Sequence, residues 1–79
     1  MTKEEIFDGL KELLHTIKPG VDQSAITMDS TLVFDLGIDS LSILLLSIAI
    51  ETKYGFKFDQ VPPFVTVGDV VEYIAAKTA

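Results

Sequence analysis

The absence of cysteine constrains the fold of this 79-residue chain more than any other feature of its sequence. Without disulfide bonds, a chain this short must be stabilised by packing alone, which favours compact helices whose apolar faces meet. Apolar residues make up 48% of the chain, enough for such a core. The lack of cysteine also excludes a thiol nucleophile and a Cys-ligated zinc, and it fits a reducing cytoplasm. We therefore expect one domain over residues 1–79, in a cytoplasmic protein.

The net charge of −6 limits the possible partners. Twelve acidic residues outnumber six lysines, so nucleic acids and anionic membrane surfaces would be repelled. Proteins with basic patches are the expected partners. The N-terminus lacks the apolar stretch of a secretory signal, and the apolar window 41–50 is far shorter than the roughly 20 residues of a membrane-spanning helix. We expect no membrane insertion.

The first helix is expected over residues 2–17. Thr2 and Glu5 form a capping-box pattern, in which each side chain accepts a hydrogen bond from an unpaired backbone N–H. Apolar residues then recur at helical spacing on one face. Pro19 and Gly20 end the helix, because proline disfavours helical geometry in the residue before it.

A second helix is expected over residues 40–54, with Asp39 or Ser40 as its N-cap and Gly55 at its end. Between the first two helices lies a loop of about 20 residues, which is unusually long for a small domain. We expect this loop to be ordered, because its apolar side chains can anchor it across the helix ends. These anchors are Val21, Ile26, Leu32, Val33, Phe34 and Leu36.

The remaining segments complete an all-α fold. Pro62 and Pro63 limit residues 56–65 to one helical turn. Thr66 and Asp69 repeat the capping pattern and begin a last amphipathic helix. Three main helices plus one short helix make a small antiparallel helical bundle.

Few residues are candidates for catalysis or metal binding. Ser40 lacks the G-x-S-x-G context of a hydrolase nucleophile, and His15 near a helix end is typical of a solvated surface residue. Asp29, Asp35 and Asp39 miss the spacing of a calcium-binding EF-hand loop. We expect no enzyme and no metal site, and a small serine hydrolase is a remote alternative.

One continuous run carries a family resemblance. The run Asp35-Leu36-Gly37-Ile38-Asp39-Ser40-Leu41 resembles the phosphopantetheine-attachment motif of acyl carrier proteins, which has the form D-L-G-x-D-S-L. The resemblance extends over essentially the whole chain, including the helix–long loop–helix spacing. It implies a 4'-phosphopantetheine arm joined to Ser40, on which acyl groups travel as thioesters in fatty acid, lipid or polyketide biosynthesis. It also implies a monomer whose partners are a phosphopantetheinyl transferase and acyl-transferring, ketosynthase or other synthase enzymes.

The physical chemistry of the motif agrees with this resemblance. A serine in the first turn of a helix presents its hydroxyl at the edge of the fold, where the helix dipole and unpaired N–H groups favour a phosphodiester. Gly37 permits a sharp turn of the backbone before Ser40. The resemblance implies that Asp39 helps the transferase and its magnesium ion engage Ser40, and we place Leu41 beside the arm. Taken in isolation, Ser40 would be interpreted as a simple N-cap.

The second helix has two apolar arcs, one suited to the core and one adjacent to Ser40. We expect the second arc to be partly exposed and to meet partner enzymes or the acyl chain. The predicted partner-binding residues are Leu41, Leu44, Leu45 and Ile48, together with Asp35 and Glu51. By resemblance, carriers shield the acyl chain between helices, and the predicted lining is Leu46, Ile50, Phe56, Val61, Phe64 and Ile74.

This helix also departs from the family. Carriers of primary fatty acid synthesis resemble one another in an acidic second helix, whereas here only Glu51 is acidic among Ser42, Leu45, Glu51, Thr52 and Lys53. We therefore expect a specialised carrier whose partners make a more hydrophobic contact. Two alternatives remain: a peptidyl or aminoacyl carrier, and an unmodified helical adaptor that binds through the second arc.

Overall fold

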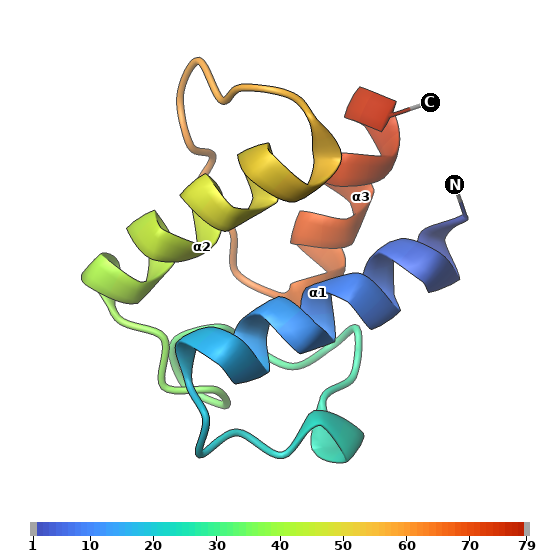
Figure 1. Ribbon diagram of the computed structural model, residues 1–79. Coiled ribbons are helices and arrows are strands. Elements are labelled where there is room, and N and C mark those ends of the chain that lie inside the picture. The colour runs from blue at the N-terminus through green and yellow to red at the C-terminus, as the bar shows by residue number, and fades with distance from the viewer. Residues whose placement is uncertain (1, 79) are drawn as a thin grey trace.

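A computed structural model describes residues 2–78 as a three-helix fold. The helices are α1 (Lys3–Ile17), α2 (Ser40–Tyr54) and α3 (Val67–Thr78), and a 3-10 helix η1 (Gln23–Ala25) lies in the first loop. In Figure 1, α1 and α2 run in opposite directions, and α3 lies beside them. Within residues 2–78 no strand forms, and one isolated bridge joins Thr31 and Thr66. The prediction of a small all-α bundle is confirmed.

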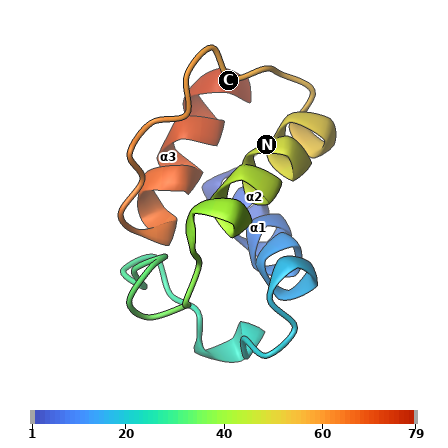
Figure 2. The same ribbon diagram turned by 90° about the vertical axis from the view of Figure 1, so that its left-hand side faces the viewer.

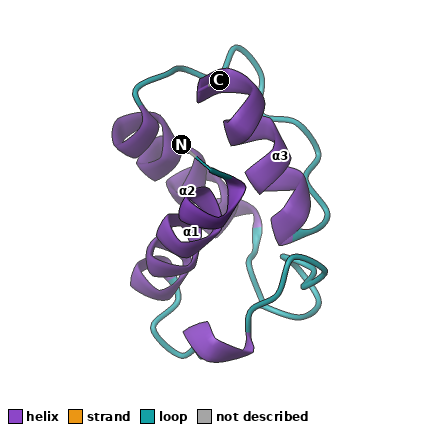
Figure 3. Ribbon diagram, turned by 90° about the vertical axis from the view of Figure 1, so that its right-hand side faces the viewer, coloured by secondary structure: helices purple, strands orange, loops and turns teal. Residues whose placement is uncertain are grey.

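The core lies where the three helices meet. Each helix contributes the face that its periodicity predicts: α1 buries three apolar residues, α2 two and α3 four. Figures 2 and 3 show α3 on one side of the bundle and α2, with α1 below it, on the other. The buried helical residues are Ile6, Leu10, Leu14, Leu46, Ile50, Val67, Val70, Val71 and Ile74.

Both predicted capping boxes are formed. The Thr2 hydroxyl accepts from the Glu5 N–H at 3.1 Å, and the Glu5 carboxylate accepts from the Thr2 N–H at 3.0 Å. At α3 the Thr66 hydroxyl accepts from the Asp69 N–H at 3.1 Å, and the Asp69 carboxylate accepts from the Thr66 N–H at 3.0 Å. These bonds satisfy N–H groups that an isolated helix end leaves unpaired.

The long first loop is ordered, as expected, because backbone hydrogen bonds join it to the start of α3. The Leu32 N–H donates to the Val65 carbonyl at 2.9 Å, and the Val67 N–H donates to the Ser30 carbonyl at 2.9 Å. The Gly68 N–H donates to the Met28 carbonyl at 2.8 Å. The segment before α2 is thus tied to the segment before α3.

Two of the predicted loop anchors are wrong. Val33 and Phe34 are 52% and 90% exposed, whereas Ile26 and Leu32 are buried. Ile38 is fully buried and supplies the anchor nearest to α2. A turn at residues 31–36 explains why Ile38 is buried in place of Phe34. The turn points the Phe34 side chain outward and returns the chain to the core at Ile38.

The short helix occurs at a different place from the predicted one. The segment 56–65 forms no helical turn, since Pro62 and Pro63 lack the N–H groups that a turn requires. Its aromatic rings instead pack around Tyr73 of α3, with the Phe58 and Tyr73 ring centroids 5.1 Å apart. The short helix η1 forms in the first loop, where Asp22 caps it.

Candidate functional site

Ser40 is the first residue of α2, and its side chain is exposed. Within residues 2–78 its hydroxyl makes no hydrogen bond, and the N–H groups of Ser40 and Leu41 have no acceptor. A 15-residue helix therefore begins with two unpaired donors beside an accessible hydroxyl. This geometry suits attachment of an anionic group.

Asp39, and not Ser40, is the N-cap of α2. Its carboxylate accepts from the Ser42 N–H at 2.8 Å, and its carbonyl accepts from the Ile43 N–H at 2.9 Å. The hydrogen bonds from Ser42, with a smaller effect of the Lys18 charge, hold the pKa of the Asp39 carboxyl below its usual value. The capping role falls to Asp39, which leaves the Ser40 hydroxyl available for modification.

Gly37 has the left-handed backbone that the turn before α2 requires, with φ at 67°. Its N–H donates to the Val33 carbonyl at 3.1 Å, and the Ile38 N–H donates to the Leu32 carbonyl at 2.8 Å. A Cβ at Gly37 would meet no atom within 4 Å. Glycine is therefore required here for backbone conformation rather than for space.

Gly37→Ala is expected to lower the free energy of unfolding by about 1–2 kcal/mol, the cost of a side chain in the left-handed region. Gly20→Ala is the matched control: its φ lies outside that region, and its Cβ would also meet nothing within 4 Å. The control should be neutral or slightly stabilising. Urea unfolding followed by circular dichroism measures both, and equal stability of the two variants would contradict the role assigned to Gly37.

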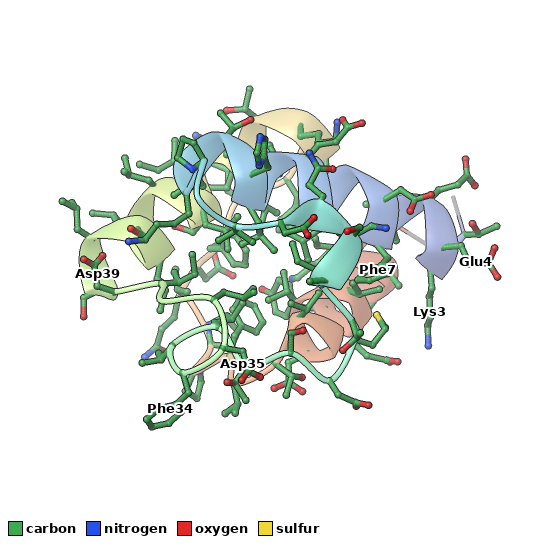
Figure 4. The ribbon with its side chains drawn as sticks, turned by 90° about the horizontal axis from the view of Figure 1, so that it is seen from below. Lys3, Glu4, Phe7, Phe34, Asp35 and Asp39 are labelled. Carbon is green, nitrogen blue, oxygen red and sulfur yellow. The ribbon has the colours of Figure 1, made fainter. Side chains whose placement is uncertain are left out.

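The two predicted acidic partner residues both form hydrogen bonds within the fold. The exposed Asp35 carboxylate accepts from the Thr31 N–H at 2.8 Å and stabilises the turn before α2, where Figure 4 shows it beside Phe34. The half-buried Glu51 carboxylate accepts from the Phe58 N–H at 2.7 Å and holds the start of the second loop. The sequence pattern does not indicate these roles, because both depend on where the loops return.

The arc of α2 adjacent to Ser40 is exposed, as predicted. We call it the apolar α2 face; its members are 49–66% exposed and are Leu41, Leu44, Leu45 and Ile48. The opposite arc packs into the core through Leu46 and Ile50. Glu51 and Lys53 are the charged residues of α2, so the helix has no net charge although the chain carries −6.

The predicted acyl-chain lining divides into three groups by burial. Three members, Leu46, Ile50 and Ile74, are buried in the core, while Phe56 and Phe64 are half-buried against it. Val61 is exposed. Because protein cores are densely packed, an acyl chain could reach the three core residues only if the helices moved apart.

The structure gives no catalytic or metal-binding arrangement in residues 2–78. His15 Nδ1 lies 3.0 Å from the Val21 carbonyl and is paired there rather than with Ser40. No group of three metal-ligating side chains occurs in this part of the chain. Among the described helices, none has the length and apolar character needed to cross a membrane.

Comparison with known proteins identifies the family. The family described as "phosphopantetheine attachment site" matches residues 10–74, which include the whole motif and most of all three helices. The chain belongs to this family of carrier proteins. It is 40% identical to the acyl carrier protein of Thermotoga maritima over 78 residues, which cover 96% of this chain and 95% of that protein.

Further acyl carrier proteins are similar over nearly the full chain. The chain is 41% identical to the meromycolate extension acyl carrier protein of Mycolicibacterium smegmatis, with 92% of this chain and 75% of that protein covered. The acyl carrier protein of Tropheryma whipplei is 32% identical over 100% of this chain and 98% of its own length. The chain is thus an acyl carrier protein whose prosthetic group is phosphopantetheine.

Proposed function

We propose that the Ser40 hydroxyl bears the phosphopantetheine arm, and that residues 1–79 form one acyl-carrier domain without catalytic chemistry of its own. The observation that carries this proposal is the exposed hydroxyl at the first residue of α2, which makes no hydrogen bond within residues 2–78. Two unpaired N–H groups and the positive end of the helix dipole favour a phosphodiester there. The arm supplies the thiol that the sequence lacks, and acyl groups are held on it as thioesters.

Ser40 acts as an acceptor in this proposal and not as an activated nucleophile. No base contacts its hydroxyl within residues 2–78, so the transferase must supply the proton acceptor. Asp39 supports the reaction by position: it immediately precedes Ser40, and the hydrogen bond from the Ser42 N–H, which lowers the pKa of its carboxyl, holds the carboxylate at the same helix end. We propose that this carboxylate also helps hold the transferase's magnesium ion, as the resemblance to carrier proteins implies.

Intact-mass spectrometry after incubation with coenzyme A and a phosphopantetheinyl transferase tests the attachment. We expect the wild-type chain to gain one phosphopantetheine and Ser40→Ala to gain none. Ser42→Ala is the matched control, because Ser42 lies in the same helical turn and the substitution keeps the backbone N–H that it donates to the Asp39 cap. A modified Ser40→Ala chain, or an unmodified wild type with several transferases, would overturn the proposal.

We propose further that the synthase and transferase partners bind the apolar α2 face. This face lies next to Ser40 and is both exposed and uncharged, so a partner with an apolar groove fits it better than one with a basic patch. An apolar contact of this kind supports a role for the chain in a specialised pathway of fatty acid or lipid synthesis. One relative is named for meromycolate extension, which agrees with such a pathway.

A further inference from the structure

A cleft of about 720 Å³ lies between the end of α1 and the turn that carries Phe34, and its lining extends to Gly37, three residues before α2 begins. One wall contains Lys18, Val21 and Ala25, and the other contains Leu36 and Gly37. We propose that this cleft receives the part of the phosphopantetheine arm nearest to Ser40, with the Lys18 ammonium group paired to the phosphodiester. The inference rests on the proposed attachment at Ser40.

Lys18 is the cation best placed for this role. It lines the cleft and is half-buried, and within residues 2–78 no carboxylate lies within 4.0 Å of its ammonium group. By contrast, Lys3 pairs with Glu72 at 2.8 Å and Lys11 with Asp8 at 3.2 Å. Lys18 therefore carries an unpaired positive charge on a wall of the cleft.

The position of Lys18 also relates it to the attachment point. Gly37, on the facing wall, precedes Ser40 by only three residues. The Lys18 charge is one of the influences that lower the pKa of Asp39, the residue that immediately precedes Ser40. A phosphodiester on the Ser40 hydroxyl would thus begin three residues from Gly37, which lines the same cleft as Lys18.

The walls of the cleft suit an amphiphilic chain better than a free anion. Val21 and Leu36 are half-buried and apolar, and they match the dimethyl-substituted carbon of the pantoyl group. Asp22 and Asp35 also line the cleft, and their carboxylates already accept hydrogen bonds from Ser24 and Thr31. These two negative charges would oppose binding of free inorganic phosphate.

The covalent bond to Ser40 offsets the repulsion between the phosphodiester and the carboxylates of Asp22 and Asp35. A group joined to Ser40 is present at the cleft at an effective concentration of the order of millimolar or more, so weak contacts suffice to populate the docked arrangement. The thiol end of the arm would extend past the rim of the cleft, where Phe34 is 90% exposed. Docking therefore restrains the part of the arm nearest to Ser40 and leaves the thiol end free to reach partner enzymes.

Nuclear magnetic resonance of the holo protein tests the inference. We expect apo-to-holo changes in amide shifts to include Val21, Ala25 and Leu36, with nuclear Overhauser contacts from the pantoyl methyl groups to Val21 or Leu36. Lys18→Ala should lower the ratio of docked to free arm about two- to fivefold, the usual range for an exposed ion pair. Ala25→Leu should abolish the contacts, because the larger side chain enters the cleft.

Lys57→Ala is the matched control, since Lys57 is exposed in the second loop and does not line this cleft. It should leave the docked population unchanged. Free inorganic phosphate should produce no shift changes in the cleft of the apo protein. A holo protein whose shift changes stay within residues 38–42, or whose contacts survive Lys18→Ala undiminished, would overturn the inference while leaving the attachment intact. If the mass of the treated protein shows no added phosphopantetheine, both the attachment at Ser40 and the docking of the arm are contradicted.

Discussion

Ile38→Ala is expected to lower the free energy of unfolding by about 2–5 kcal/mol, the range for truncating a buried isoleucine. Ile38 is fully buried although the residues on both sides of it are exposed. Its side chain is what returns the loop to the core before α2 begins. A chain of 79 residues has a total stability of about 4–12 kcal/mol, so this single truncation removes a large share of it.

Val33→Ala is the control for Ile38→Ala, because it removes apolar atoms from the same loop at a position that is 52% exposed. Its effect should stay within about 0.5 kcal/mol. Urea unfolding followed by circular dichroism measures both variants. Equal destabilisation by the two substitutions would show that Ile38 does not anchor the loop in solution.

A double substitution of the apolar α2 face, Leu44→Asp with Leu45→Asp, is expected to impair partner enzymes strongly without unfolding the protein. Both side chains are about half exposed, so the core loses little. In a complex, however, each new carboxylate would be desolvated against an apolar surface. Hot-spot residues near the centre of an interface lose about 2 kcal/mol or more when changed, which corresponds to a fall of about 30-fold in affinity.

The measurement is kcat/KM for conversion of the apo protein to the holo protein by a phosphopantetheinyl transferase. The matched control is Thr16→Asp with Ala76→Asp, which adds the same charge at exposed positions of α1 and α3. We expect the control to retain activity close to that of the wild type. Equal losses in both double variants would indicate a general charge effect and would contradict docking on the apolar α2 face.

The sequence predicts the helices well because their signals are local. The capping boxes at Thr2 and Thr66 and the glycine that ends α2 each lie within a few residues of the helix end they define. Gly55 is in the left-handed conformation, with φ at 74°, as such a helix end requires. The exposed apolar α2 face also follows from periodicity, because two other helices are too few to cover α2 on all sides.

The loops are predicted less well because burial there depends on tertiary contacts. Phe34 and Ile38 are both large and apolar, and only the turn stabilised by Asp35 decides that the first is exposed and the second buried. The hydrogen bond from Phe58 to Glu51 likewise joins a helix to a loop whose path no local pattern specifies. No sequence pattern singles out Lys18, because only folding brings it to the same cleft as Gly37.

The role of Asp39 shows how the structure resolves an ambiguity that the sequence leaves open. Either Asp39 or Ser40 fits the N-cap pattern, and a capping serine would have its hydroxyl engaged with the backbone. The 2.8 Å hydrogen bond from the Ser42 N–H assigns the cap to Asp39. Within residues 2–78 the Ser40 hydroxyl is then free at the start of α2, which is the condition on which the proposed attachment depends.

Fragmentation mass spectrometry of the modified protein tests this assignment most directly. A peptide that contains both Ser40 and Ser42 should carry the phosphopantetheine, and its fragments should place the added mass on Ser40 alone. Added mass on Ser42, or on any other serine of the chain, would contradict the account.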